Sequence, residues 1–77
     1  MDRKLLNLFD ALIEGQKEKL LERGRTFVPQ LTPEDMLQPN DFDELEHNPY
    51  FRYEEGILDG IQLSKSALLA CLKDLGY

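Results

Sequence analysis

Apolar residues near the start of the chain recur at intervals of three and four. This spacing predicts an amphipathic helix over about residues 3–23. Asp2 is suited to cap the start of that helix, and Gly24 is suited to end it in the left-handed conformation. The recurring positions are Leu5, Leu6, Leu8, Phe9, Leu12, Ile13, Leu20 and Leu21.

A second apolar pattern of helical spacing fills the C-terminal third and predicts a helix over about residues 49–75. Asn48 precedes Pro49, which is a favoured residue at a first helical position, and Gly76 follows the pattern as a stop signal. One broad face should face the core, with Cys71 as a small buried hydrophobe on it. Its members are Tyr50, Tyr53, Ile57, Ile61, Leu68, Cys71, Leu72 and Leu75.

The connector over about residues 25–48 is punctuated by proline. Val28 precedes Pro29, a pairing that disfavours helix, so the connector should begin as an extended segment. Thr32 and Asp35 have the spacing of a capping box and predict a short helical turn. Asn40 is suited to cap a second short helix, over about residues 41–46.

The predicted fold is all-α, with residues 1–77 as a single helical domain. Two long amphipathic helices form an α-hairpin, joined by the connector with its one or two short helical turns. Both apolar stripes are broader than a two-helix seam requires, and one cysteine allows no internal disulfide. We therefore expect two hairpins to pair as a homodimeric four-helix bundle.

The net charge of −6 is unevenly distributed. Residues 1–25 hold six basic and five acidic side chains, for +1, whereas residues 26–77 hold three basic and ten acidic ones, for −7. An acidic surface repels phosphate backbones, so no direct nucleic-acid partner is expected. The start of the chain lacks a continuous apolar signal core, and no apolar run is long enough to span a bilayer, which predicts a cytoplasmic protein with no membrane partner.

Aromatic and charged residues gather just after Asn48, and they are the predicted binding surface. Tyrosine and arginine dominate binding hot spots, and the acidic side chains beside them favour a protein partner with a basic surface. The alternative is that the connector covers the aromatic side chains. The predicted partner-binding residues are Tyr50, Phe51, Arg52, Tyr53, Glu54, Glu55 and Asp59.

Gly56 and Gly60 stand four residues apart within the second helix, where each glycine costs about 1 kcal/mol relative to alanine. They share one side of the helix, so their spacing predicts a close helix crossing within the bundle or the dimer. A contact site for a partner or ligand, and a local break at Gly56, are the alternatives.

Glu44 and His47 have the i, i+3 spacing of a carboxylate–imidazole metal motif. The competing interpretation is a surface histidine beside a helix end. No phosphate-binding loop, dinucleotide fingerprint or nucleophile motif is present, so the sequence predicts no catalytic residue, no cofactor and no enzyme.

The leading hypothesis is a small acidic interaction module, of the adaptor or regulatory-subunit type, that binds a protein partner through its connector. The first alternative is a metal-binding helical bundle that uses Glu44 and His47. The second is an anionic mimic that occupies a nucleic-acid-binding protein.

Overall fold

The computed structural model describes residues 3–76, and these residues form helices and turns with no strand. The all-α prediction is confirmed. The long helices are α1 (Arg3–Phe27) and α3 (Pro49–Asp74). Between them lie two single 3₁₀ turns, η1 (Asp35–Leu37) and η2 (Pro39–Asp41), and the four-residue helix α2 (Asp43–Glu46).

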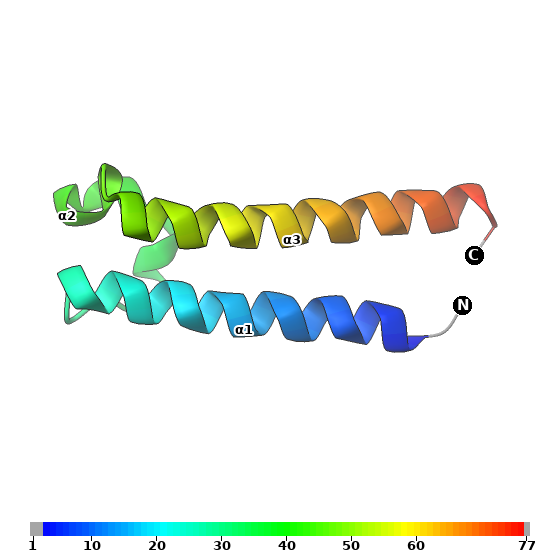
Figure 1. Cartoon of the computed structure of the whole chain (residues 1–77), viewed down its shortest axis with the longest axis horizontal. Helices are drawn as coiled ribbons and strands as arrows, with labels where there is room; N and C mark the ends of the chain where they lie inside the picture. The colour runs from blue at the N-terminus through cyan, green and yellow to red at the C-terminus, as the bar shows by residue number, and fades with distance from the viewer. Residues whose placement is uncertain (1–2, 77) are drawn as a thin grey trace.

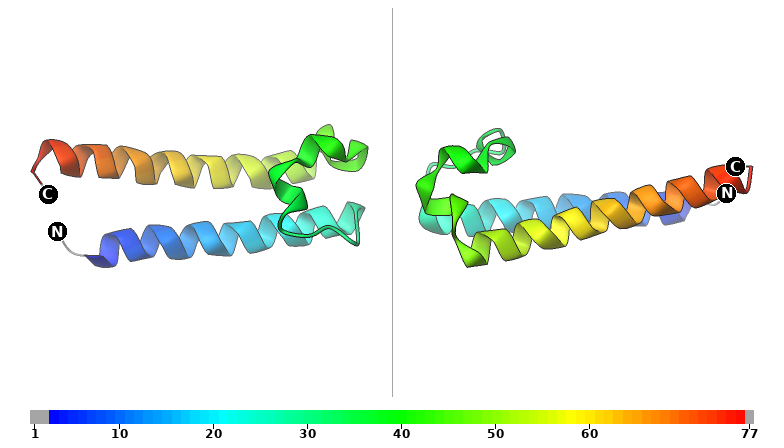
Figure 2. Two further views of the ribbon diagram at one scale, coloured as in Figure 1. Left: turned by 180° about the vertical axis from the view of Figure 1, so that it is seen from behind. Right: turned by 90° about the horizontal axis from the view of Figure 1, so that it is seen from above.

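The helices α1 and α3 lie side by side and run in opposite directions, in a structure 45 Å long and 18 Å wide (Figure 1). Residues 28–48, here called the elbow, join them at one end. Viewed from above in Figure 2, the elbow folds back over one side of the two-helix layer. The layer therefore has an elbow side and an uncovered side, and near the termini the elbow covers neither.

The first helix continues past Gly24 to Phe27, so the predicted end near residue 23 and the extended segment at Arg25 are wrong. Gly24 is not left-handed, because Gly76 is the one residue with positive φ among those described. The helix ends one residue before Val28, which Pro29 disfavours in the helical conformation. Gly24 is instead needed for packing. A Cβ there would lie 2.4 Å from Leu31 Cδ2 and 3.3 Å from Phe51 Cε2.

Side-chain caps fix the start of α3 and of the first 3₁₀ turn of the elbow. The Asn48 side chain accepts hydrogen bonds from the backbone N–H groups of Tyr50 and Phe51 at 3.0 and 3.1 Å, as predicted. The capping box is also confirmed. Thr32 Oγ1 accepts from the N–H of Asp35 at 3.2 Å, and the Asp35 carboxylate accepts from the N–H of Thr32 at 3.0 Å. These bonds satisfy N–H groups that a helix start leaves without a backbone partner.

The second short helix departs from its prediction. α2 begins at Asp43, and no side chain caps it. Asn40, the expected cap, instead accepts a hydrogen bond from Arg52.

The core lies in the half of the molecule nearest the elbow. Three side chains, Leu31, Leu45 and Phe51, are fully buried there, and Met36 and Phe42 of the elbow pack against them. The remaining buried apolar residues are Ile13, Leu20, Val28 and Leu58.

The face that the second helix presents to α1 is rotated from the predicted one, although Ile61 of the predicted face does pack against the core. Phe51 and Leu58 are its buried residues, whereas Tyr50 and Tyr53, assigned to the core face, are exposed. Cys71 is exposed as well, so its expected burial is wrong. The helix stops at its terminus as anticipated, with Gly76 at φ 88°.

We expect Gly24→Ala to destabilise the protein although alanine favours helix. Overfilling a packed core costs about 1–3 kcal/mol, and the gain in helix propensity offsets about 1 kcal/mol of this. Urea denaturation should show a net loss of about 1 kcal/mol in the free energy of unfolding.

The matched control is Gly15→Ala on the same helix, where a Cβ would meet nothing within 4 Å. It should stabilise the protein by up to about 1 kcal/mol. Equal effects of the two substitutions would contradict the packing assigned to Gly24.

Candidate binding groove

A groove of 640 Å³ runs between α1, α3 and the elbow. α1 and α3 form its two sides, and the 3₁₀ turns of the elbow close over it. Its lining residues are Glu14, Lys17, Glu18, Leu20, Leu21, Pro33, Met36, Leu37, Pro39, Glu55, Leu58, Asp59 and Gln62.

The groove combines an apolar lining with an acidic border. Leucine, methionine and proline side chains come from all three elements, and Leu37 is 79% exposed on the elbow. The acidic members are Glu14 and Glu18 of α1 and Glu55 and Asp59 of α3, with Lys17 as the one basic residue of the lining. Glu14 is paired with Lys17 at 3.5 Å and Glu55 with Arg52, so the negative charge of the groove rests chiefly on Glu18 and Asp59, beside a lining that offers apolar contacts.

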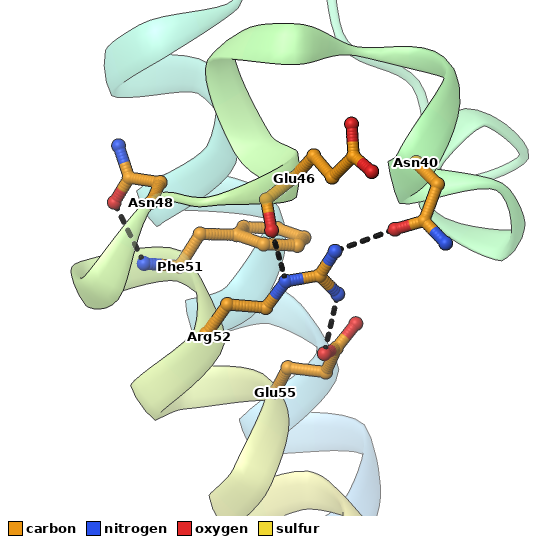
Figure 3. Close-up of polar contacts among 6 residues, drawn as sticks. All are labelled: Asn40, Glu46, Asn48, Phe51, Arg52 and Glu55. Atoms are coloured by element: carbon orange, nitrogen blue, oxygen red, sulfur yellow. Dashed lines mark hydrogen bonds and ion pairs between the residues drawn. The ribbon is translucent and has the colours of Figure 1, made fainter.

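Arg52 holds the elbow to α3, as Figure 3 shows. Its Nε donates a hydrogen bond to the Glu46 carbonyl at 2.9 Å, and one terminal nitrogen donates to the Asn40 side chain at 2.5 Å. The other terminal nitrogen lies 2.7 Å from Glu55 Oε1 in an ion pair. The planar guanidinium thus joins three separate segments with a fixed geometry, as a lysine ammonium could not.

The predicted binding residues on α3 separate into structural and exposed ones. Phe51 is fully buried, so its assignment to a binding surface is wrong. Arg52 has a mainly structural role. Glu54 accepts two hydrogen bonds from the buried side chain of Gln16, at 2.9 Å to its carbonyl and 2.7 Å to its carboxylate. Only Glu55 and Asp59 of the predicted set line the groove.

The two tyrosines are exposed but do not line the groove. Tyr50 is 62% and Tyr53 is 68% exposed. The ring of Tyr50 stacks on Phe27, with 6.4 Å between the ring centroids, and the Arg23 guanidinium lies 5.9 Å from its centre. The acidic and aromatic residues that the sequence grouped together therefore belong to different sides of α3.

Among residues 3–76, Gly56 and Gly60 make no close helix crossing. A Cβ at either position would meet nothing within 4 Å, and both residues are exposed. A close approach by another chain remains a prediction for this pair.

Glu44 and His47 are both exposed. The imidazole of His47 lies 4.0 Å from the Glu46 carboxylate, an ion pair only when the histidine is protonated. Within residues 3–76, no three His, Cys, Asp or Glu side chains come together as metal ligands. The metal-binding alternative thus gains no support.

Sequence reasoning missed the α1 side of the groove. The available signal was the breadth of the two apolar patterns, since Leu21 belongs to the first and Leu58 lies outside the face predicted for the second. Of the apolar side chains of the elbow, Met36 packs against the core, whereas Leu37 stays exposed.

Comparisons of the chain with protein-family models, curated proteins and solved structures gave no match. Within the described part of the chain, neither long helix has an apolar stretch that could cross a membrane.

We expect Arg52→Lys to destabilise the protein by about 1–2 kcal/mol, because lysine cannot reach all three acceptors and the site is partly exposed. Thermal denaturation followed by circular dichroism would measure the loss. Arg23→Lys is the control, since Arg23 contacts only the exposed ring of Tyr50 in the interactions described. It should change stability by less than about 0.5 kcal/mol, and an equal loss in both variants would contradict the role given to Arg52.

Proposed function

We propose that this protein is a non-catalytic interaction module that binds a protein segment in the groove between its two long helices and its elbow. The observation that carries the proposal is the apolar lining of the groove inside a border of four carboxylates. A function of the adaptor or regulatory-subunit type fits a surface with these properties.

The groove favours a segment with apolar side chains flanked by lysine or arginine. Apolar side chains would enter between Leu21, Leu58 and Met36, and basic ones would meet the carboxylates of Glu18 and Asp59. Charge complementarity of this kind speeds association and selects partners, and salt weakens it. An amphipathic helix is one form of such a segment, because its apolar face can lie in a groove.

Two finer features of the expected fold belong to the same proposal. The long helices with their elbow act as one α-hairpin, and two hairpins pair into a four-helix bundle. The elbow then remains free to bind its partner.

The probe for the groove is a fluorescent peptide with leucine and lysine at helical spacing, compared with the same peptide carrying glutamate for lysine. Fluorescence polarisation should show binding of the lysine peptide alone, weakening as salt is raised. The double variant Glu18→Lys/Asp59→Lys should bind it about tenfold more weakly, because both substitutions turn attraction into repulsion.

The matched control is Asp43→Lys/Asp74→Lys, which changes the net charge equally at residues outside the groove lining. It should keep most of the affinity. Equal losses in the two double variants would mean that the peptide responds to net charge, and the groove would be rejected as the site.

Leu37→Ser tests the apolar part of the same surface. Leu37 is largely exposed, so its replacement should leave the free energy of unfolding within about 0.5 kcal/mol of the original. Removing the leucine should weaken binding of the lysine peptide several-fold, measured in the same polarisation assay. Unchanged affinity would remove the elbow from the binding surface.

A further inference from the structure

The half of the molecule nearest the termini has no core of its own. Residues 3–12 of α1, residues 59–74 of α3 and the two residues that follow contain no buried side chain. Helices in proteins take most of their stability from packing of an apolar face, and short isolated helices are marginal in water. This open half therefore needs cover that the chain itself does not supply.

On the elbow side, the open half is polar, and an ion pair already joins its two helices. Lys65 Nζ lies 2.6 Å from the Asp10 carboxylate in an ion pair between the two helices. The shallow hollow around this pair is lined by Glu14, Lys17, Gln62 and Ser66, with Ile13 and Leu69 as its apolar members. This side can remain in contact with water.

On the opposite side, α1 exposes leucines. Leu5, Leu8 and Leu12 follow one another at intervals of three and four, so they share one side of the helix. Each leaves about half of its surface exposed. By helical spacing they lie roughly half a turn from Glu14 and Leu21, which line the groove.

The neighbouring face of α3 continues this apolar surface. Ile57, Leu68 and Leu75 share one side of the helix, about half a turn from Glu55 and Gln62 of the groove. They belong to the apolar stripe predicted to face the core. Ile61 of that stripe packs against the core, whereas Ile57 and Leu68 stay half-buried because Phe51 and Leu58 take the buried positions. Leu75 is largely exposed. We call Leu5, Leu8, Leu12, Ile57, Leu68 and Leu75 the uncovered face.

The distribution of charge favours a second copy of this chain as the occupant. A chain of net charge −6 repels its copies unless the acidic side chains are kept apart. In the open half, Asp10 lies on the elbow side, where it pairs with Lys65, and the helical position of Asp74 is well away from Leu75 and Leu68. Two uncovered faces can therefore meet there without placing carboxylates against each other.

The size of the face also fits a dimer. The whole uncovered side of the two-helix layer, 45 Å long and 18 Å wide, offers about 800 Å², which is the area that each partner contributes to a standard stable interface, and the open half supplies about half of it. Two such layers stacked face to face make a four-helix arrangement.

We infer that the uncovered face is the self-association interface, and that the open half of each chain is covered by the same face of a second chain. The inference rests on the pairing of two chains within the proposed function, and it assigns that pairing to one side of the molecule. The groove lies on the other side and stays accessible in the dimer.

Light scattering coupled to size exclusion, over a wide range of concentration, measures the mass of the particle. The unmodified chain should form a species of twice the 9.0 kDa chain mass. Leu12→Glu should convert it to a monomer, because a carboxylate would be buried in the interface. Leu63→Glu is the control, since Leu63 is also an exposed leucine but lies on the outer side of α3, and it should remain dimeric.

Leu12→Ala covers the case in which Leu12→Glu fails to fold, because it adds no charge. It should raise the dimer dissociation constant at least tenfold, whereas Leu63→Ala should leave that constant within about twofold. A 9.0 kDa particle for the unmodified chain at every concentration would overturn the inference. So would an equal effect of the substitutions at Leu12 and Leu63.

The outcome is separable from that of the groove. A monomer that still binds the lysine peptide would reject self-association and keep the proposed docking site. A dimer that binds no peptide would support self-association and reject the groove as the docking site.

Discussion

The structure depends on the close contact of Phe51 with Gly24. The missing side chain at Gly24 lets the aromatic ring and Leu31 approach the backbone of α1. This contact places the start of α3 against the end of α1, while Asn48 caps the same turn of α3. The groove also depends on this junction. Arg52 follows Phe51 in the chain, so the contact of Phe51 with α1 places Arg52 where it can hold the elbow to α3.

The large elements could be predicted from the sequence, since helical spacing and proline signals act locally. Asn48, Thr32 and Asp35 were correctly identified as caps because each bond spans only two or three residues. Gly24 was misread for the opposite reason. A glycine near the end of an apolar pattern serves equally well as a stop or as a packing site, and the packing of Leu31 and of the distant Phe51 decides between them.

The candidate site was less predictable because it depends on the rotation of α3. The sequence ranks the stripe containing Tyr50, Ile57 and Leu68 as the most apolar, yet the single large ring of Phe51 sets which side turns inward. That rotation buries Phe51, separates the tyrosines from the groove, and leaves Glu55 and Asp59 beside it. Helical periodicity gives the width of an apolar face but does not decide which part of a broad face meets its own chain.

The attachment of the elbow gives the molecule two levels of local stability. Leu31 and Leu45 anchor the elbow in the core and Met36 packs against it, whereas the outer parts of its turns, with Leu37 and Asn40, are held by polar contacts such as the Thr32–Asp35 box and the bond between Arg52 and Asn40. Such partly exposed polar contacts open at lower free energy than a packed core does. We therefore expect the outer edge of the groove wall to open more readily than α1 and α3 separate, so that a bound segment would meet one adjustable wall and two fixed ones.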